Sequence, residues 1–123
     1  MSITSLFQNA HFWMMTIAMI AFGLSGYSAT VHKPNPWFKV HKFSALTGAI
    51  FGIVGIILTG LNLNLTHGII GLISILFLVG GVIGGFIARK KKDPKIRKMH
   101  LWLGRVIYFV AFINLIIGIS FFF

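Results

Sequence analysis

The sequence predicts an all-α protein: an integral membrane bundle of four transmembrane helices, forming one domain over residues 1–123. Three observations predict this fold. The chain is 57% hydrophobic and 10% charged, and a soluble domain of this length could not cover so much apolar surface with polar groups. Four long apolar stretches stand between short polar breaks, and all basic residues lie in or near alternate breaks. We therefore expect a multi-pass protein of the cytoplasmic membrane, with the lipid bilayer as its surroundings.

Each apolar stretch is long enough to cross a membrane as a helix. The stretches have about 24 residues each, or about 36 Å of helix, which spans the hydrocarbon core with some tilt. They cover about residues 7–30, 38–61, 65–88 and 99–123. The first stretch lacks the basic segment of a signal peptide and is too long for one, so we expect a retained helix.

The breaks between the stretches contain residues that end helices. Pro34 and Pro36 cannot continue a helix from the first stretch into the second. Asn62-Leu63-Asn64 predicts a tight turn before the third stretch. The segment 89–98, which contains Pro94, predicts a charged loop before the fourth.

The basic residues predict the orientation in the membrane. Because consecutive helices run in opposite directions, both termini and the 62–64 turn lie on one side, and the other two connections lie on the second side. All eleven basic residues belong to the second side: Lys33, Lys39, Lys42, Arg89, Lys90, Lys91, Lys92, Lys95, Arg97, Lys98 and Arg105. The positive-inside rule places that side in the cytoplasm and both termini outside. A net charge of +10 interleaved with apolar sequence indicates membrane anchoring, so we expect no nucleic-acid partner.

Histidine is the one strong metal ligand present in number. The chain has no cysteine, which excludes thiolate metal sites, iron–sulfur ligation and covalent c-type haem. One histidine lies near the start of each predicted helix: His11, His41, His67 and His100. The alternating directions place His11 with His67 on the outer side, and His41 with His100 on the cytoplasmic side. Two imidazoles from different helices can hold one haem iron in this way; placement of the histidines among lipid headgroups is the alternative.

Glycines on the histidine-bearing faces are candidate contacts for a flat cofactor. Gly71 and Gly104 each lie one turn after a histidine, and Gly48 lies on the face of His41. A porphyrin needs small side chains beside its axial imidazole. The G-x-x-x-G of Gly48 and Gly52 is also typical of close helix packing without a cofactor, so both interpretations stay open at this point.

Four segments around the histidines resemble the cytochrome b561 family. They are Asn9–Met15, Lys39–His41, Thr66–Gly71 and Met99–Arg105, the last followed by Asn114 and Gly118, and the resemblance runs from about Asn9 to Gly118. It implies two non-covalent haem b groups, with the first core histidine paired with the third and the second with the fourth. The helix directions predict the same pairing. A short four-helix, prokaryotic-type member is expected, because the outer helices of the usual six-helix form are not recognised.

The resemblance implies transmembrane electron transfer, with His11 and His67 on an outer haem iron and His41 and His100 on a cytoplasmic-side haem iron. Lys42 and Arg105 are candidates for pairing with haem propionates or with an anionic donor. The expected partners are a small-molecule or protein electron donor and acceptor, a quinone or an anionic reductant among them. A homodimer or a place in a larger complex is also compatible with the sequence, and so is a transmembrane oxidoreductase activity.

Two other classes of function are alternatives to electron transfer. A histidine-based metal or proton transporter would need acidic groups in the membrane, yet Asp93 is the only carboxylate side chain and lies outside every predicted span. A cofactor-free anchor subunit of a larger complex would carry its histidines at the membrane interface.

Overall fold

The computed structural model describes residues 9–59 and 63–121, and these residues form four α-helices and no strand. The helices are α2 (Ala10–Val31), α3 (Trp37–Thr59), α4 (Thr66–Lys91) and α5 (Pro94–Ser120). Each is long and apolar enough to cross a membrane, which confirms the all-α, four-span prediction. The predicted span ends at Phe7, Leu61 and Phe123, and Asn62 of the predicted turn, lie outside the described residues.

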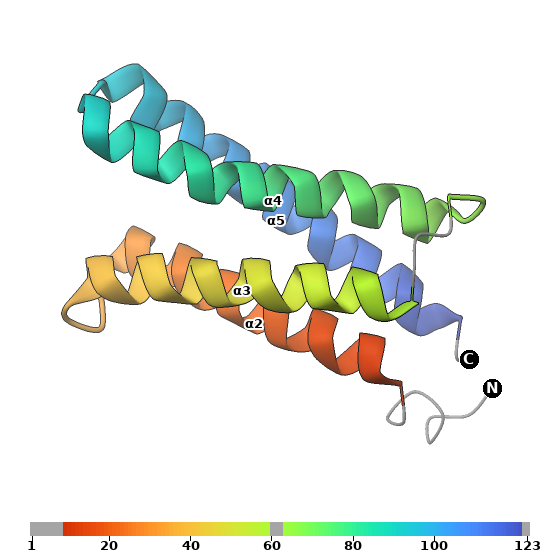
Figure 1. Cartoon of the computed structure of the whole chain (residues 1–123). Helices are drawn as coiled ribbons and strands as arrows, with labels where there is room; N and C mark the ends of the chain where they lie inside the picture. Colours follow the sequence, from red (N-terminus) through yellow and green to blue (C-terminus); the bar gives the residue numbers. More distant parts are fainter. Residues whose placement is uncertain (1–8, 60–62, 122–123) are drawn as a thin grey trace.

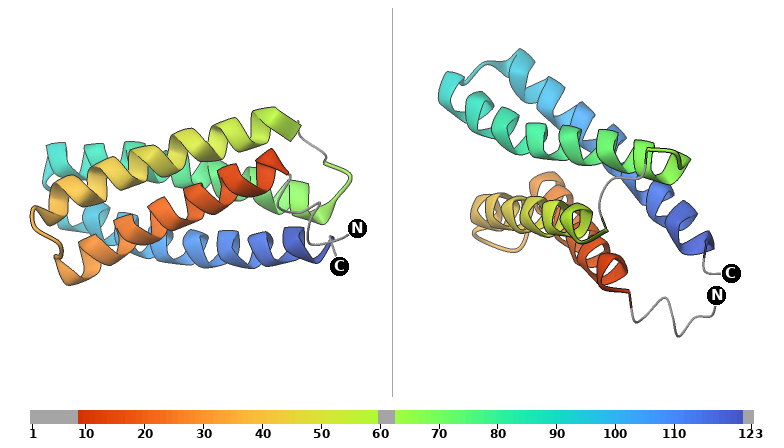
Figure 2. Two further views of the ribbon diagram at one scale, coloured as in Figure 1. Left: turned by 90° about the horizontal axis from the view of Figure 1, so that it is seen from below. Right: turned by 45° about the vertical axis from the view of Figure 1, so that its right-hand side comes forward.

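The four helices are arranged as two antiparallel hairpins. In Figure 1, α2 and α3 form the lower hairpin, and α4 and α5 form the upper one. Packing is most extensive within each hairpin, while α3 with α4 and α2 with α5 make fewer contacts between hairpins. Figure 2 shows the two hairpins as separate pairs that diverge toward one end. A cofactor bound between the hairpins would therefore add contacts where the helices make few direct ones.

The two ends of the bundle differ in charge. The α2–α3 and α4–α5 connections share one end, which we call the basic end, because the basic residues of these connections lie there. The start of α2 and the end of α5 share the opposite end, which we call the terminal end (Figure 1). This arrangement agrees with the alternating helix directions expected from the sequence.

The α4–α5 connection differs from the charged loop predicted over residues 89–98. Helix α4 continues into this segment and ends at Lys91, and its C-cap Lys92 has a left-handed backbone with φ 51°. Asp93 caps α5 by accepting a 2.9 Å hydrogen bond from the backbone N–H of Lys95. Pro94 occupies the first helical turn, where its missing N–H leaves no hydrogen bond unmade. Only two residues therefore connect the helices, and the proline begins a helix.

A small apolar core lies where all four helices meet. It consists of one buried residue from each helix: Phe22, Ala49, Leu78 and Ala111. Large apolar side chains on the outer surfaces are exposed, among them Ile57 at 71%. Such a surface suits contact with lipid rather than with water.

Candidate functional site

The four helix-borne histidines form two pairs, one near each end of the bundle. His11 on α2 and His67 on α4 have ring centroids 6.2 Å apart and ring planes at 89°. His41 on α3 and His100 on α5 have centroids 6.1 Å apart and planes at 85°. We call these the terminal pair and the basic pair. Each pair takes one residue from each hairpin, and the partners are those that the helix directions predict.

The spacing within each pair suits two ligands on opposite sides of one metal ion. An imidazole nitrogen binds a metal at about 2 Å and the ring centroid lies about 1 Å further out, so opposed rings have centroids roughly 6 Å apart. The described residues contain no group of three or more His, Cys, Asp or Glu that could hold a metal. Each pair therefore supplies two ligands, which fits a metal that brings its own equatorial nitrogens, as haem iron does.

Backbone carbonyls orient three of the four rings. We assign the Nδ1 atom as the donor to a carbonyl of the neighbouring helix in the same hairpin: His11 to Gly55 (2.8 Å), His41 to Ser25 (2.9 Å) and His67 to Asn114 (3.0 Å). A ring protonated at Nδ1 keeps its Nε2 lone pair for a metal. Ser25 also donates from its hydroxyl to the His41 carbonyl at 2.8 Å, which ties α2 to α3 at the basic pair.

Glycines on the neighbouring helix of each hairpin leave room for two of the rings. A Cβ built at Gly118 would lie 2.6 Å from Cε1 and 3.0 Å from Nε2 of His67. A Cβ built at Gly85 would lie 3.2 Å from Cε1 of His100. The Gly118 separation is shorter than side chains tolerate, so this position requires glycine or a displaced imidazole.

The glycines predicted as cofactor contacts lie in three different surroundings. Gly71 lines a cavity beside the terminal pair, and a Cβ there would lie 3.1 Å from the Asn114 amide nitrogen. Gly48 is buried against Phe22, whose ring would lie 2.8 Å from an added Cβ. Gly104 is exposed and has no neighbouring atom within 4 Å of an added Cβ among the described residues. Gly71 therefore lies beside the terminal pair, while cofactor contacts of Gly48 and Gly104 at the basic pair stay predictions.

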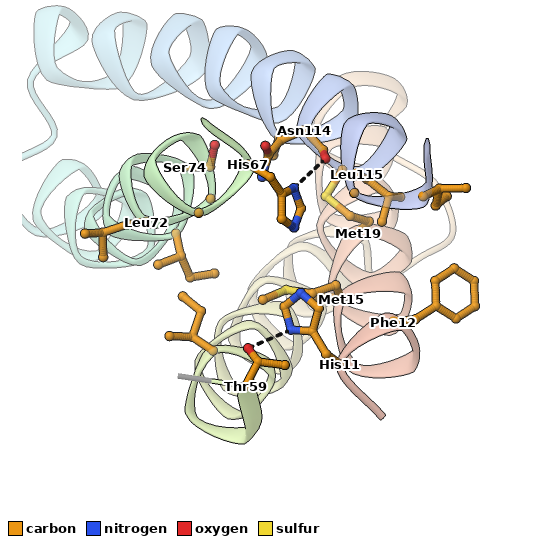
Figure 3. A pocket seen from close by; sticks show the side chains of 18 of the residues that line it. His11, Phe12, Met15, Met19, Thr59, His67, Leu72, Ser74, Asn114 and Leu115 are labelled. Carbon is orange, nitrogen blue, oxygen red and sulfur yellow. Dashed lines mark hydrogen bonds between the residues drawn. The ribbon is translucent and has the colours of Figure 1, made fainter. Parts of the chain in front are cut away.

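A cavity of about 440 Å³ lies beside the terminal pair, between the two hairpins. Figure 3 shows the rings of His11 and His67 facing one another across it, with Met15 and Met19 on its wall. The volume is in the range of about 300–1,000 Å³ that small-molecule and cofactor sites occupy. The residues that line the cavity include no lysine, arginine or carboxylate, which suits an apolar macrocycle.

Basic side chains of α3, α4 and α5 rest on aromatic rings. Lys42 has its Nζ 5.6 Å from the ring centroids of Phe43 and Phe86. Arg105 has its guanidinium carbon 5.6 Å from the Trp102 ring centroid. These cation–π contacts hold the charges at the bundle surface. Similarly, the Arg89 guanidinium carbon lies 4.6 Å from the centroid of Phe38.

Comparison with known proteins identifies the family to which the chain belongs. The sequence model of the family described as eukaryotic cytochrome b561 matches residues 6–123. The chain belongs to the cytochrome b561 family, as the resemblance predicted. It is thus a multi-pass membrane protein of a family that carries electrons across membranes on haem b. The expectation of a prokaryotic-type member stays a prediction, since the family description names eukaryotic proteins.

A curated relative supports the same family. A cytochrome b561 and DOMON domain-containing protein of Arabidopsis thaliana is 31% identical over 99 residues, or 72% of this chain. The aligned part is 24% of the relative's length, so the chain spans about a quarter of that protein. No solved structure matches the chain.

Proposed function

We propose that the chain binds two haem b groups, each by two histidines, and passes electrons between them across the membrane. The observation that carries this proposal is the crossed histidine pair near each end, with ring centroids 6.2 Å and 6.1 Å apart. His11 and His67 would hold one iron, and His41 and His100 the other. Family membership supports haem b, and the absence of cysteine supports non-covalent binding.

The protein's own residues orient the ligands and exclude water. Haem supplies the one-electron redox chemistry when bound. The carbonyls of Gly55, Ser25 and Asn114 fix the Nδ1 protons of the three rings, which would leave each Nε2 lone pair for an iron. Between the two sites lies the apolar cluster to which Phe22, Ala49, Leu78 and Ala111 contribute. This low-dielectric interior would shield two bound irons from bulk water.

The charges at the basic end determine which electron donor we propose there. Lys42 and Arg105 would pair with haem propionates at the basic pair, or with a donor that docks beside it. Because the described residues at this end carry many cations and the single carboxylate Asp93, an anionic reductant is the donor class best matched by charge. A quinone or a protein remains the proposed partner class for the terminal end.

We predict that the basic end faces the cytoplasm and that both termini are extracytoplasmic, because lysine and arginine are retained on the cytoplasmic side during insertion. Reporter fusions to the C-terminus that are active only outside the cytoplasm should be active. Proteolysis in oriented vesicles should cut the connection around Lys92 only from the cytoplasmic face. A cytoplasmic C-terminus would contradict the orientation and reverse the assignment of the two haem sides.

We predict that both ferric haems give the strongly anisotropic low-spin electron paramagnetic resonance signal of crossed axial imidazoles. The ring planes lie at 89° and 85°, and crossed rings leave the iron d orbitals that overlap them nearly equal in energy. Spectra of the oxidised, purified protein test this directly. A rhombic signal typical of parallel rings, or a high-spin signal from a five-coordinate iron, would contradict it.

A further inference from the structure

Two buried polar atoms beside the terminal pair have no hydrogen-bond partner among the described protein atoms: Ser74 Oγ and Asn114 Oδ1. Their residues are 4% and 6% exposed, and both line the 440 Å³ cavity. Figure 3 shows them on neighbouring helices at the side of the cavity that holds His67. The Asn114 side-chain amide faces Gly71, because a Cβ built at Gly71 would lie 3.1 Å from its amide nitrogen. Ser74 lies one helical turn after Gly71 on the same face of α4.

The Ser74 hydroxyl behaves differently from most hydroxyls in these helices. Others donate to a carbonyl of their own helix one turn earlier: Ser28 to Ser25 (3.0 Å), Thr30 to Gly26 (2.8 Å), Thr47 to Phe43 (2.9 Å) and Ser120 to Ile117 (2.6 Å). That bond satisfies a hydroxyl locally in an apolar environment. Ser74 does not form it, so its hydroxyl is left for a partner in the cavity.

Asn114 connects this polar spot to the metal ligand. Its backbone carbonyl accepts the 3.0 Å hydrogen bond from His67 Nδ1, while its side-chain oxygen is unpartnered. A molecule bound by Ser74 and Asn114 therefore lies beside His67. Because the link to His67 uses the backbone, side-chain substitutions at Asn114 leave that bond in place.

We propose that Ser74 and Asn114 bind one water molecule beside His67, and that this water tunes the reduction potential of the haem at the terminal pair. The inference rests on the proposed function. The residues that line the cavity include no lysine, arginine or carboxylate, so a neutral ligand fits. A buried water typically makes about three hydrogen bonds and takes about 30 Å³. The Ser74 hydroxyl and the Asn114 side-chain oxygen offer two of these bonds.

The water would stabilise the oxidised haem. Ferric haem with two neutral imidazoles carries one more positive charge than the ferrous form, and in a low-dielectric site a reorienting dipole lowers the free energy of the charged form. Removing the water and its two holders makes the site more apolar. The midpoint potential of that haem then rises, while the haem at the basic pair is unchanged.

Redox-induced infrared difference spectra of the full-length, haem-loaded protein, recorded in ordinary and in ¹⁸O water, test this inference. The wild type should show an O–H stretching band that shifts with the isotope. The double variant Ser74→Ala/Asn114→Leu should lose the band and raise the midpoint potential of one haem only. Thr16→Val is the matched control, because Thr16 Oγ1 is also buried and unpartnered but Thr16 does not line the cavity. This variant should keep the isotope-sensitive band and the wild-type midpoint potentials.

The outcomes separate this inference from the proposed function. A haem-loaded wild type without the isotope-sensitive band, or a double variant that keeps the band, overturns the water site alone. If the double variant fails to hold haem, the single variant Ser74→Ala decides, since it removes only a hydroxyl and should abolish the band. A wild-type protein that binds no haem overturns the proposed function, and this inference with it.

Discussion

His41→Ala and His100→Ala are each expected to remove the same haem and leave the other spectrally intact. His11→Ala and His67→Ala should together define the second site in the same way. Each pair is close enough for one iron, with ring centroids about 6 Å apart. Loss of one axial ligand leaves the iron poorly held, so the second substitution in a pair should add little further loss. Redox titration and haem quantification of the four single and two double variants measure this.

His32→Ala is the matched control for these variants. His32 lies on the α2–α3 connection, where its ring stacks on Trp37 at 4.3 Å between centroids, and it belongs to neither pair. Both haems should remain in this variant. If His11→Ala and His41→Ala removed the same spectral component, the pairing across hairpins would be wrong.

Gly118→Ala is expected to displace His67 and weaken haem binding at the terminal pair. The new Cβ would lie 2.6 Å from Cε1 and 3.0 Å from Nε2 of His67. Overpacking of this kind costs about 1–3 kcal/mol, which corresponds to roughly 5- to 150-fold weaker binding if the cost falls on haem affinity. Haem titration of the apoprotein, followed at the absorption of each site, measures the effect.

Gly80→Ala provides the control for that substitution. Gly80 lies on α4, and a Cβ there meets no described atom within 4 Å, so haem affinity should match the wild type. Wild-type affinity in Gly118→Ala would contradict the position assigned to the His67 ring.

The four-span fold and the histidine pairing could be predicted from the sequence, because apolar length and helix direction determine both. The charges of residues 89–98 did not reveal that most of this segment is helical. Lysine and arginine are good helix formers and are favourable at a helix C-terminus, so α4 extends into the basic run. The Asp93-Pro94 pair is a cap followed by a first-turn proline, and it was the sequence signal for the start of α5.

The groups that orient the histidines were less accessible from the sequence. The acceptors for His11, His41 and His67 are backbone carbonyls, which every residue possesses. The glycine that approaches a paired histidine most closely is Gly118, which contacts His67. It lies on the neighbouring helix of the hairpin rather than one turn after His67. Finding it requires the register between α4 and α5, which depends on how the side chains of the two helices pack. The Asn114 and Gly118 signals were present only through the family resemblance.

The haem-to-protein ratio of the purified protein, measured with its reduced-minus-oxidised spectrum after expression with ample haem, tests the central claim most directly. The two histidine pairs predict two low-spin haem b groups per chain, both extractable by acidic organic solvent because no thioether bond is possible without cysteine. A protein without a Soret band would contradict haem binding, and a ratio of one would contradict a complete path across the membrane.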